Sequence, residues 1–239
     1  MKCGQIDGDL GDHRWQKATC SAPKTCAVCG ETTGEIGDHE YTKQIPTAEY
    51  LCAAATVESP AKYYYACEHC GEMGKLFVYT YGDSIESKWA WNYYVDYKFG
   101  DLTDEWYVTP RDYIKGTFSN SATTNSDLQV EILYDCNNDI AIFLYEYGDL
   151  DNQVKNNSSK YSDSYEVTIK NNAGKTIEVT GKIYAGGDRL FLSNVSQVLS
   201  MMKSSTVMRF FIQEEDSPTT QYRFDVDLTD FNYILTVVE

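Results

Sequence analysis

A cysteine and histidine pattern that recurs at a fixed interval constrains this chain more than any other feature. The pair Cys29-Gly30 follows Cys3-Gly4, and the triplet ending at His39 follows the same Gly-Asp-His triplet ending at His13, each by 26 residues. A Cys-x-x-Cys pair followed by glycine folds into a knuckle that directs both thiolates at one ion, and structural disulfides rarely bridge so short a spacing. The pattern therefore predicts an array of structural zinc sites, with a disulfide framework as the alternative.

Two assignments of ligands are compatible with the first repeat. In the leading frame, the ligands are His13, Cys20, Cys26 and Cys29. In the trailing frame, the same three cysteines close on His39 instead. We favour the leading frame because no histidine follows Cys70, whereas His39 precedes the last Cys-x-x-Cys pair. Three thiolates and one imidazole form a closed tetrahedral set, which is typical of structural zinc and leaves no position open for catalysis.

A second site is predicted further along the chain. The leading frame gives it the ligands His39, Cys52, Cys67 and Cys70. Val57 stands where alignment with the first repeat places the third thiolate, so Cys52 has to replace it through a local change of register. His69 is the fallback ligand, but its place inside the Cys-x-x-Cys pair directs it away from an ion that its neighbours hold.

These residues carry a resemblance. The stretch GDHRWQKATCSAPKTCAVCGETTGEIGDHEY resembles the tandem repeats HxWxxATCTxPxTCxxCGxTxGxxxGH of extracellular proteins from Gram-positive gut anaerobes, and TAEYLCAAATVESPAKYYYACEHCGEMG resembles the divergent repeat that ends such arrays. The stretches GTFSNSATTNSDLQVEIL and IAIFLYEYG are similar to an uncharacterised β-rich domain of bacterial surface proteins. The resemblance implies a secreted or cell-surface location, and it does not point to any mechanism. Cys3 then belongs to an incomplete repeat, so Met1 is expected to mark a truncated start.

Composition divides the chain into two predicted domains. Seven of the eight cysteines and all three histidines lie in the first 70 residues, where apolar side chains are sparse. We therefore expect residues 1–75 to be zinc-binding repeats held by metal crosslinks, because they cannot bury a core of their own. The net charge of −16, without any cluster of lysine and arginine, argues against nucleic-acid binding. The sequence contains no apolar run of the length that crosses a membrane, so no membrane insertion is expected.

Residues 76–239 show the period-two alternation of β-strands. Runs at 128–133 and 140–147 flank the turn cluster 135–139 and predict a hairpin, and further strands are expected at 165–169, 176–180, 189–192, 207–213 and 222–227. One short helix is predicted from the spacing of Val195, Val198, Leu199 and Met202. Many strands with regular turns predict a mainly β fold, an antiparallel β-sandwich of the jelly-roll type.

The sequence favours a binding function over catalysis. Zinc-rigidified repeats would act as a spacer, and the β domain would recognise an unknown protein or glycan ligand. No histidine follows His69, so the β domain has no histidine of its own to activate a serine or cysteine nucleophile. The alternative is a carbohydrate-active or other hydrolytic enzyme that uses a carboxylate pair, for which Asp101, Asp104 and Glu105 around Trp106 are candidates.

Overall fold

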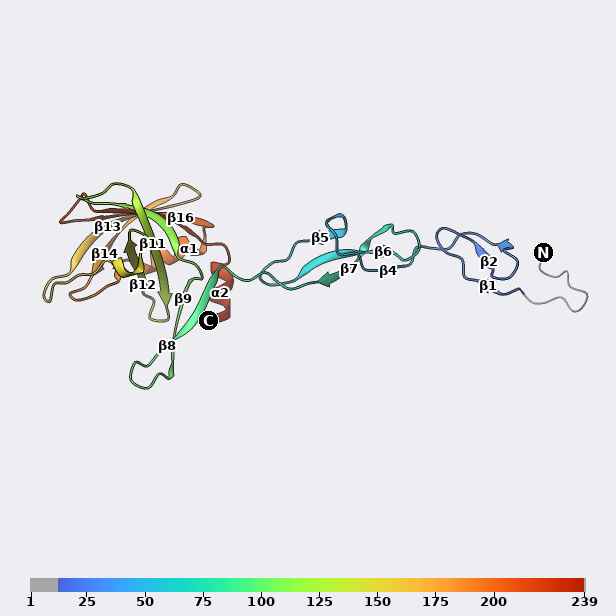
Figure 1. The fold of residues 1–239 in the computed structure, drawn as a ribbon, viewed down its shortest axis with the longest axis horizontal. Coiled ribbons are helices and arrows are strands. Elements are labelled where there is room, and N and C mark those ends of the chain that lie inside the picture. The colour runs from blue at the N-terminus through green and yellow to red at the C-terminus, as the bar shows by residue number, and fades with distance from the viewer. Residues whose placement is uncertain (1–12, 239) are drawn as a thin grey trace, which may run out of the picture. The chain divides into compact units, whose positions relative to one another are not determined.

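The computed structural model describes residues 13–238, and it divides the chain into two compact units (Figure 1). The first unit ends at Glu86 and the second begins at Ser87. The expected boundary after residue 75 falls inside strand β7 (Met73–Tyr81), which pairs with β6 (Ala61–Cys67) through Tyr81 and so belongs to the first unit. Among the described residues, no helix is both long enough and apolar enough to span a membrane.

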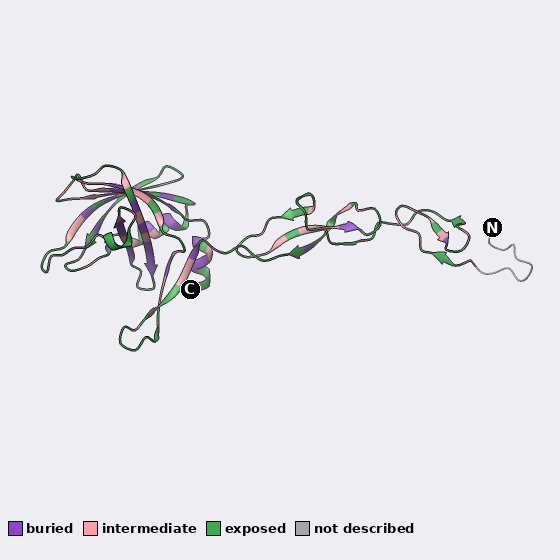
Figure 2. Ribbon diagram, in the orientation of Figure 1, coloured by how far each residue is buried: buried purple, intermediate pink, exposed green. Residues whose placement is uncertain are grey.

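In its described residues, the first unit consists of five strands of two or three residues and one longer hairpin. A three-stranded sheet contains β1 (Trp15–Gln16), β2 (Lys24–Cys26) and β3 (Thr32–Thr33). A four-stranded sheet contains β4 (Tyr41–Lys43), β5 (Leu51–Ala53), β6 and β7, and a single 3-10 turn, η1 (Ala48–Tyr50), precedes β5. Few of its side chains are buried, as Figure 2 shows. The described apolar residues with buried side chains are Cys26, Ala66, Cys67 and Tyr79, which is too small a set to form a hydrophobic core.

The second unit is a closed antiparallel barrel of eight strands. Around the barrel the order is β10 (Ile114–Ser119), β17 (Gln221–Asp227), β16 (Val207–Glu214), β13 (Asp163–Asn171), β14 (Thr176–Ile183), β15 (Leu190–Leu192), β12 (Ile140–Glu146) and β11 (Ser126–Asp135). Strand β10 closes the ring because it pairs with β17 on one side and with β11 on the other. Two more strands, β9 (Leu102–Pro110) and β8 (Trp89–Val95), extend the sheet from β11, and a 3-10 turn, η2 (Leu150–Asn152), follows β12.

Alternating side chains fill the barrel. Strand β16 buries Met208, Phe210 and Ile212, while the residues between them are more exposed. The ring of Phe210 stacks on that of Phe224 from β17 with 5.0 Å between centroids. Gly116 allows β10 to approach β17 closely, because a Cβ at this position would collide with the backbone carbonyl of Arg223.

Two helices, rather than the expected one, lie in the described part of this unit. The predicted helix is α1 (Val195–Lys203), which buries Val198, Met201 and Met202. The second, α2 (Phe231–Val238), buries Phe231, Ile234 and Leu235. The Phe231 ring contacts the ring of Trp89 at 4.8 Å between centroids, and Trp89 donates its indole N–H to the carbonyl of Asp227.

The mainly β prediction and the predicted strands are confirmed, but the sandwich is corrected to a barrel. Strands β11 and β12 form a hairpin, as do β13 and β14, over the residue ranges that the sequence predicts to be strands. A sandwich would leave two separate sheets with free edges, whereas the β10–β17 pairing joins the first barrel strand to the last and removes those edges.

Candidate metal centres

The first unit contains two groups of cysteine and histidine side chains whose ligand atoms converge. One group consists of His13, Cys26 and Cys29, and the other consists of Cys20, His39, Cys67 and Cys70. Within each group the sulfur and imidazole nitrogen atoms all lie within 4.8 Å of one another. No disulfide joins any of the seven cysteines in the described residues. Thiolate and imidazole ligands arranged in this way can hold a metal ion.

The two groups are built on the same backbone knuckle. In the first, the amide of Gly30 donates to the carbonyl of Cys26 at 2.9 Å, and the amide of Cys26 donates to the carbonyl of Glu31 at 2.8 Å. In the second, the amides of Gly71 and Cys67 make the corresponding bonds at 3.0 and 2.7 Å, the latter to Glu72. Each knuckle turns at its glycine, which has a positive φ of 74° at Gly30 and 77° at Gly71.

A glutamate lies near the Nε2 atom of each histidine. The Nδ1 atoms of His13 and His39 face the sulfur of Cys29 at 3.7 Å and of Cys70 at 3.3 Å. Their Nε2 atoms face Glu31 at 3.7 Å and Glu72 at 3.1 Å, two residues beyond those cysteines. A carboxylate that hydrogen-bonds to a ligating imidazole fixes its tautomer and increases its basicity. The separation of 3.1 Å allows this for His39 and Glu72, whereas 3.7 Å is beyond hydrogen-bond range for His13 and Glu31.

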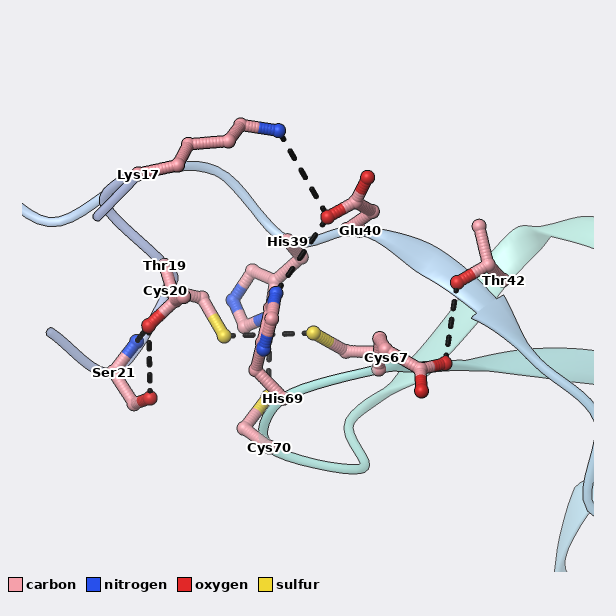
Figure 3. Close-up of polar contacts among 11 residues, drawn as sticks. Lys17, Thr19, Cys20, Ser21, His39, Glu40, Thr42, Cys67, His69 and Cys70 are labelled. Atoms are coloured by element: carbon pink, nitrogen blue, oxygen red, sulfur yellow. Dashed lines mark hydrogen bonds and ion pairs between the residues drawn. The ribbon is translucent and has the colours of Figure 1, made fainter. Parts of the chain in front are cut away.

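Cys20 reaches the second group from the preceding repeat. Its sulfur lies 3.4 Å from that of Cys67, and Figure 3 shows both pointing toward His39 and Cys70. Cys20 sits in a tight turn closed by a bridge between Thr19 and Ala22. The turn is held against the next segment because the amide of Gly37 donates to the carbonyl of Thr19 at 2.8 Å. A Cβ on Gly37 would lie 2.8 Å from the carbonyl oxygen of Ala18, so glycine permits this approach.

Three of the thiols in the two groups have pKa values that differ from the ordinary value, two of them lower and one higher. Backbone N–H groups of Cys29 and Val28 lower the pKa of Cys26 to about 5. At Cys67 burial opposes ionisation, but the N–H groups of Cys70 and His69 outweigh it and lower the pKa to about 5. Burial and the neighbouring sulfurs of Cys67 and Cys70 raise the pKa of Cys20 to about 12. A cation at the second group would offset that repulsion, so metal binding there is expected to release the Cys20 proton.

The structure groups the predicted ligands differently from the leading frame. Cys20 is not with His13 but with His39, as the trailing frame had it, while Cys26 and Cys29 stay with His13. The knuckle is the reason, since it folds Cys26 and Cys29 back toward His13 while residues 17–22 continue toward the next repeat.

Two other candidates from the sequence lie outside both groups. Cys52 lies exposed on β5 and belongs to neither group. His69 pairs through Nε2 with Glu40 at 3.5 Å and is not among the converging ligands. The need for Cys52 disappears because Cys20 supplies the third thiolate of the second group.

No protein-family model matches the chain, and no curated protein or solved structure matches it. The resemblance to tandem Cys/His repeats of extracellular proteins therefore stays a prediction.

Replacing Cys20 with serine tests the grouping. In a His13→Ala background, which disables the first group, Cys20→Ser should weaken zinc binding at the second group by more than the ~10–100-fold that loss of an outer partner costs. The matched variant Cys52→Ser should leave it unchanged. The measurement is competition for zinc with a chromophoric chelator. Equal effects of the two variants, or an effect of Cys52→Ser alone, would contradict this grouping.

Proposed function

We propose that this chain is a non-catalytic module of a secreted or cell-surface protein. Zinc-linked repeats form a spacer, and the barrel recognises a protein or glycan ligand. The observation that carries the proposal is the position of Cys20, which belongs to one repeat but converges with the ligands of the next. A metal ion held there crosslinks consecutive repeats and limits the motion of one relative to the other.

Zinc fits these groups better than other common ions. Soft thiolates select zinc, copper(I) or iron–sulfur clusters, and the mixture with imidazole in a tetrahedral set favours zinc. Structural zinc binding contributes roughly 10 kcal/mol or more of folding free energy in small domains. That contribution replaces the hydrophobic burial that the first unit lacks. The proposed role of the ion is therefore structural: it stabilises the fold of the first unit and crosslinks its repeats.

A hollow on the barrel unit supports the recognition role. It has a volume of about 380 Å³, and its lining includes Asn92, Tyr107, Tyr113, Arg111 and Glu131. Glu131 accepts a hydrogen bond from the Thr109 hydroxyl at 3.4 Å, and burial raises the pKa of its carboxyl group. Aromatic faces beside amide, guanidinium and carboxyl groups suit a polar ligand with apolar faces, such as a sugar ring.

The alternative, a hydrolytic enzyme, has one supporting observation. Asp104 and Glu105 are exposed neighbours on β9, so their side chains point to opposite faces and do not form a pair. Glu146 and Glu214, at the ends of β12 and β16, are better candidates. Burial raises the pKa of both carboxyl groups, and Glu146 also accepts a hydrogen bond from the buried Tyr222 hydroxyl at 3.1 Å. A carboxyl group with a raised pKa can serve as a general acid.

The spacer role predicts that chelation loosens the first unit alone. In amide hydrogen exchange on the full chain, removing zinc should expose the amides of Cys26, Gly37 and Cys67 to exchange at the rates of unstructured peptide. The amide of Phe210 in the barrel should keep its protection, because its strand is held by the barrel core. Protection of Gly37 that survives chelation would show that metal does not join the repeats.

The recognition role predicts binding without turnover. The zinc-loaded chain, probed on glycan and host-protein arrays, should give signals that Tyr107→Ser abolishes and Tyr97→Ser preserves. Tyr97 is the matched control because it is 88% exposed and does not line the hollow. Bound ligands should be recovered intact. Cleavage of a ligand that is lost in Glu146→Gln or Glu214→Gln would instead establish the hydrolytic alternative.

A further inference from the structure

The two groups share several local features and differ in the number of their ligands. They share the knuckle, the positive-φ glycine and the glutamate that faces the histidine. They also share a backbone hydrogen bond of 2.9 Å beside the histidine. The amide of Ala27 donates to the carbonyl of Arg14 in the first group, and the amide of Glu68 donates to the carbonyl of Glu40 in the second. Each histidine stacks on an aromatic ring two residues further on, His13 on Trp15 and His39 on Tyr41. The difference lies in the third thiolate, which Cys20 supplies to the second group.

The first group has three ligand side chains among residues 13–238, where the second group has four. Two thiolates and one imidazole leave one of the four tetrahedral positions of zinc to another donor. In the second group that donor is Cys20, which comes from the repeat before His39. Its turn packs against Gly37, whose amide donates to the carbonyl of Thr19. The Gly-Asp-His sequence of residues 37–39 also occurs at residues 11–13. The first group is therefore preceded by the same Gly-Asp-His sequence that contacts the cysteine turn in the second group.

We propose that the group of His13, Cys26 and Cys29 is an acceptor for a cysteine turn of the Cys20 kind, contributed by a different repeat of the same type. The metal ion at this group is then shared between two repeats, as it is at the second group. This inference rests on the proposed metal binding and adds to it a partner: another Ala-Thr-Cys turn.

The binding step is a ligand exchange on the ion. The incoming thiol loses its proton to the buffer, its sulfur bonds to the metal, and the water molecule that held the fourth position leaves. No oxidation is involved. Glu31 lies 3.7 Å from Nε2 of His13, on the side of the imidazole opposite to Nδ1, so the incoming thiolate does not displace it.

Cobalt(II) tests the proposal because its thiolate charge-transfer absorbance increases with the number of bound sulfurs. The full chain loaded with cobalt is titrated with a peptide of residues 17–25, KATCSAPKT. With two thiolates at the first group and three at the second, one added thiolate should raise the absorbance by about one fifth. In a Cys20→Ser, Cys67→Ser, Cys70→Ser variant, where only the first group remains, the rise should be about one half.

Three controls make the outcome decisive. The peptide with serine at position 20 should cause no rise, His13→Ala should abolish the response, and 2-mercaptoethanol at the same concentration should give a much smaller one. An equal response to 2-mercaptoethanol would overturn the proposal, because the position would then accept any thiol. A three-thiolate spectrum of the triple variant before peptide is added, or no response to the peptide, would also overturn it. Failure of the full chain to bind cobalt at all would instead refute the metal sites of the proposed function.

Discussion

The convergence of Cys20 on the ligands of the following repeat is the interaction on which the first unit depends. Apart from the hairpin of β6 and β7, the described strands of this unit are two or three residues long and few of its side chains are buried, which is too little to hold residues 13–53 in one conformation. The sulfur of Cys20, placed 3.4 Å from that of Cys67, connects residues separated by 47 positions. An ion bound there closes that loop and stabilises the fold, in the way a disulfide would in a small secreted domain.

Much of the metal site could be predicted from the sequence, but its grouping could not. The Cys-x-x-Cys-Gly spacing and the 26-residue offset identify the knuckles at Cys26 and Cys67 because their geometry is local. Which histidine Cys20 joins depends on the direction in which its turn leaves the repeat, and that is a tertiary property. A signal was present nevertheless: Val57 leaves the last knuckle without its own third cysteine, while Cys20 lies between His13 and His39 and is a ligand in both frames.

The β unit shows the same division between local and non-local information. Hairpins such as β11–β12 and β13–β14 follow from alternation and turn residues, so the sequence predicts them well. Barrel closure depends on β10 pairing with β17 about a hundred residues later, and no alternation pattern encodes that contact. The second helix was missed because α2 is apolar nearly throughout and reads equally well as a buried strand.

The most direct test of a metal ion shared between repeats is a proton–cadmium correlation spectrum of the chain loaded with ¹¹³Cd. Scalar coupling links each cadmium nucleus to the β-protons of the cysteines that ligate it. The account predicts that the β-protons of Cys20 correlate with the same cadmium resonance as those of Cys67 and Cys70. Correlation of Cys20 with the resonance of Cys26 and Cys29 would contradict it and restore a site confined to one repeat.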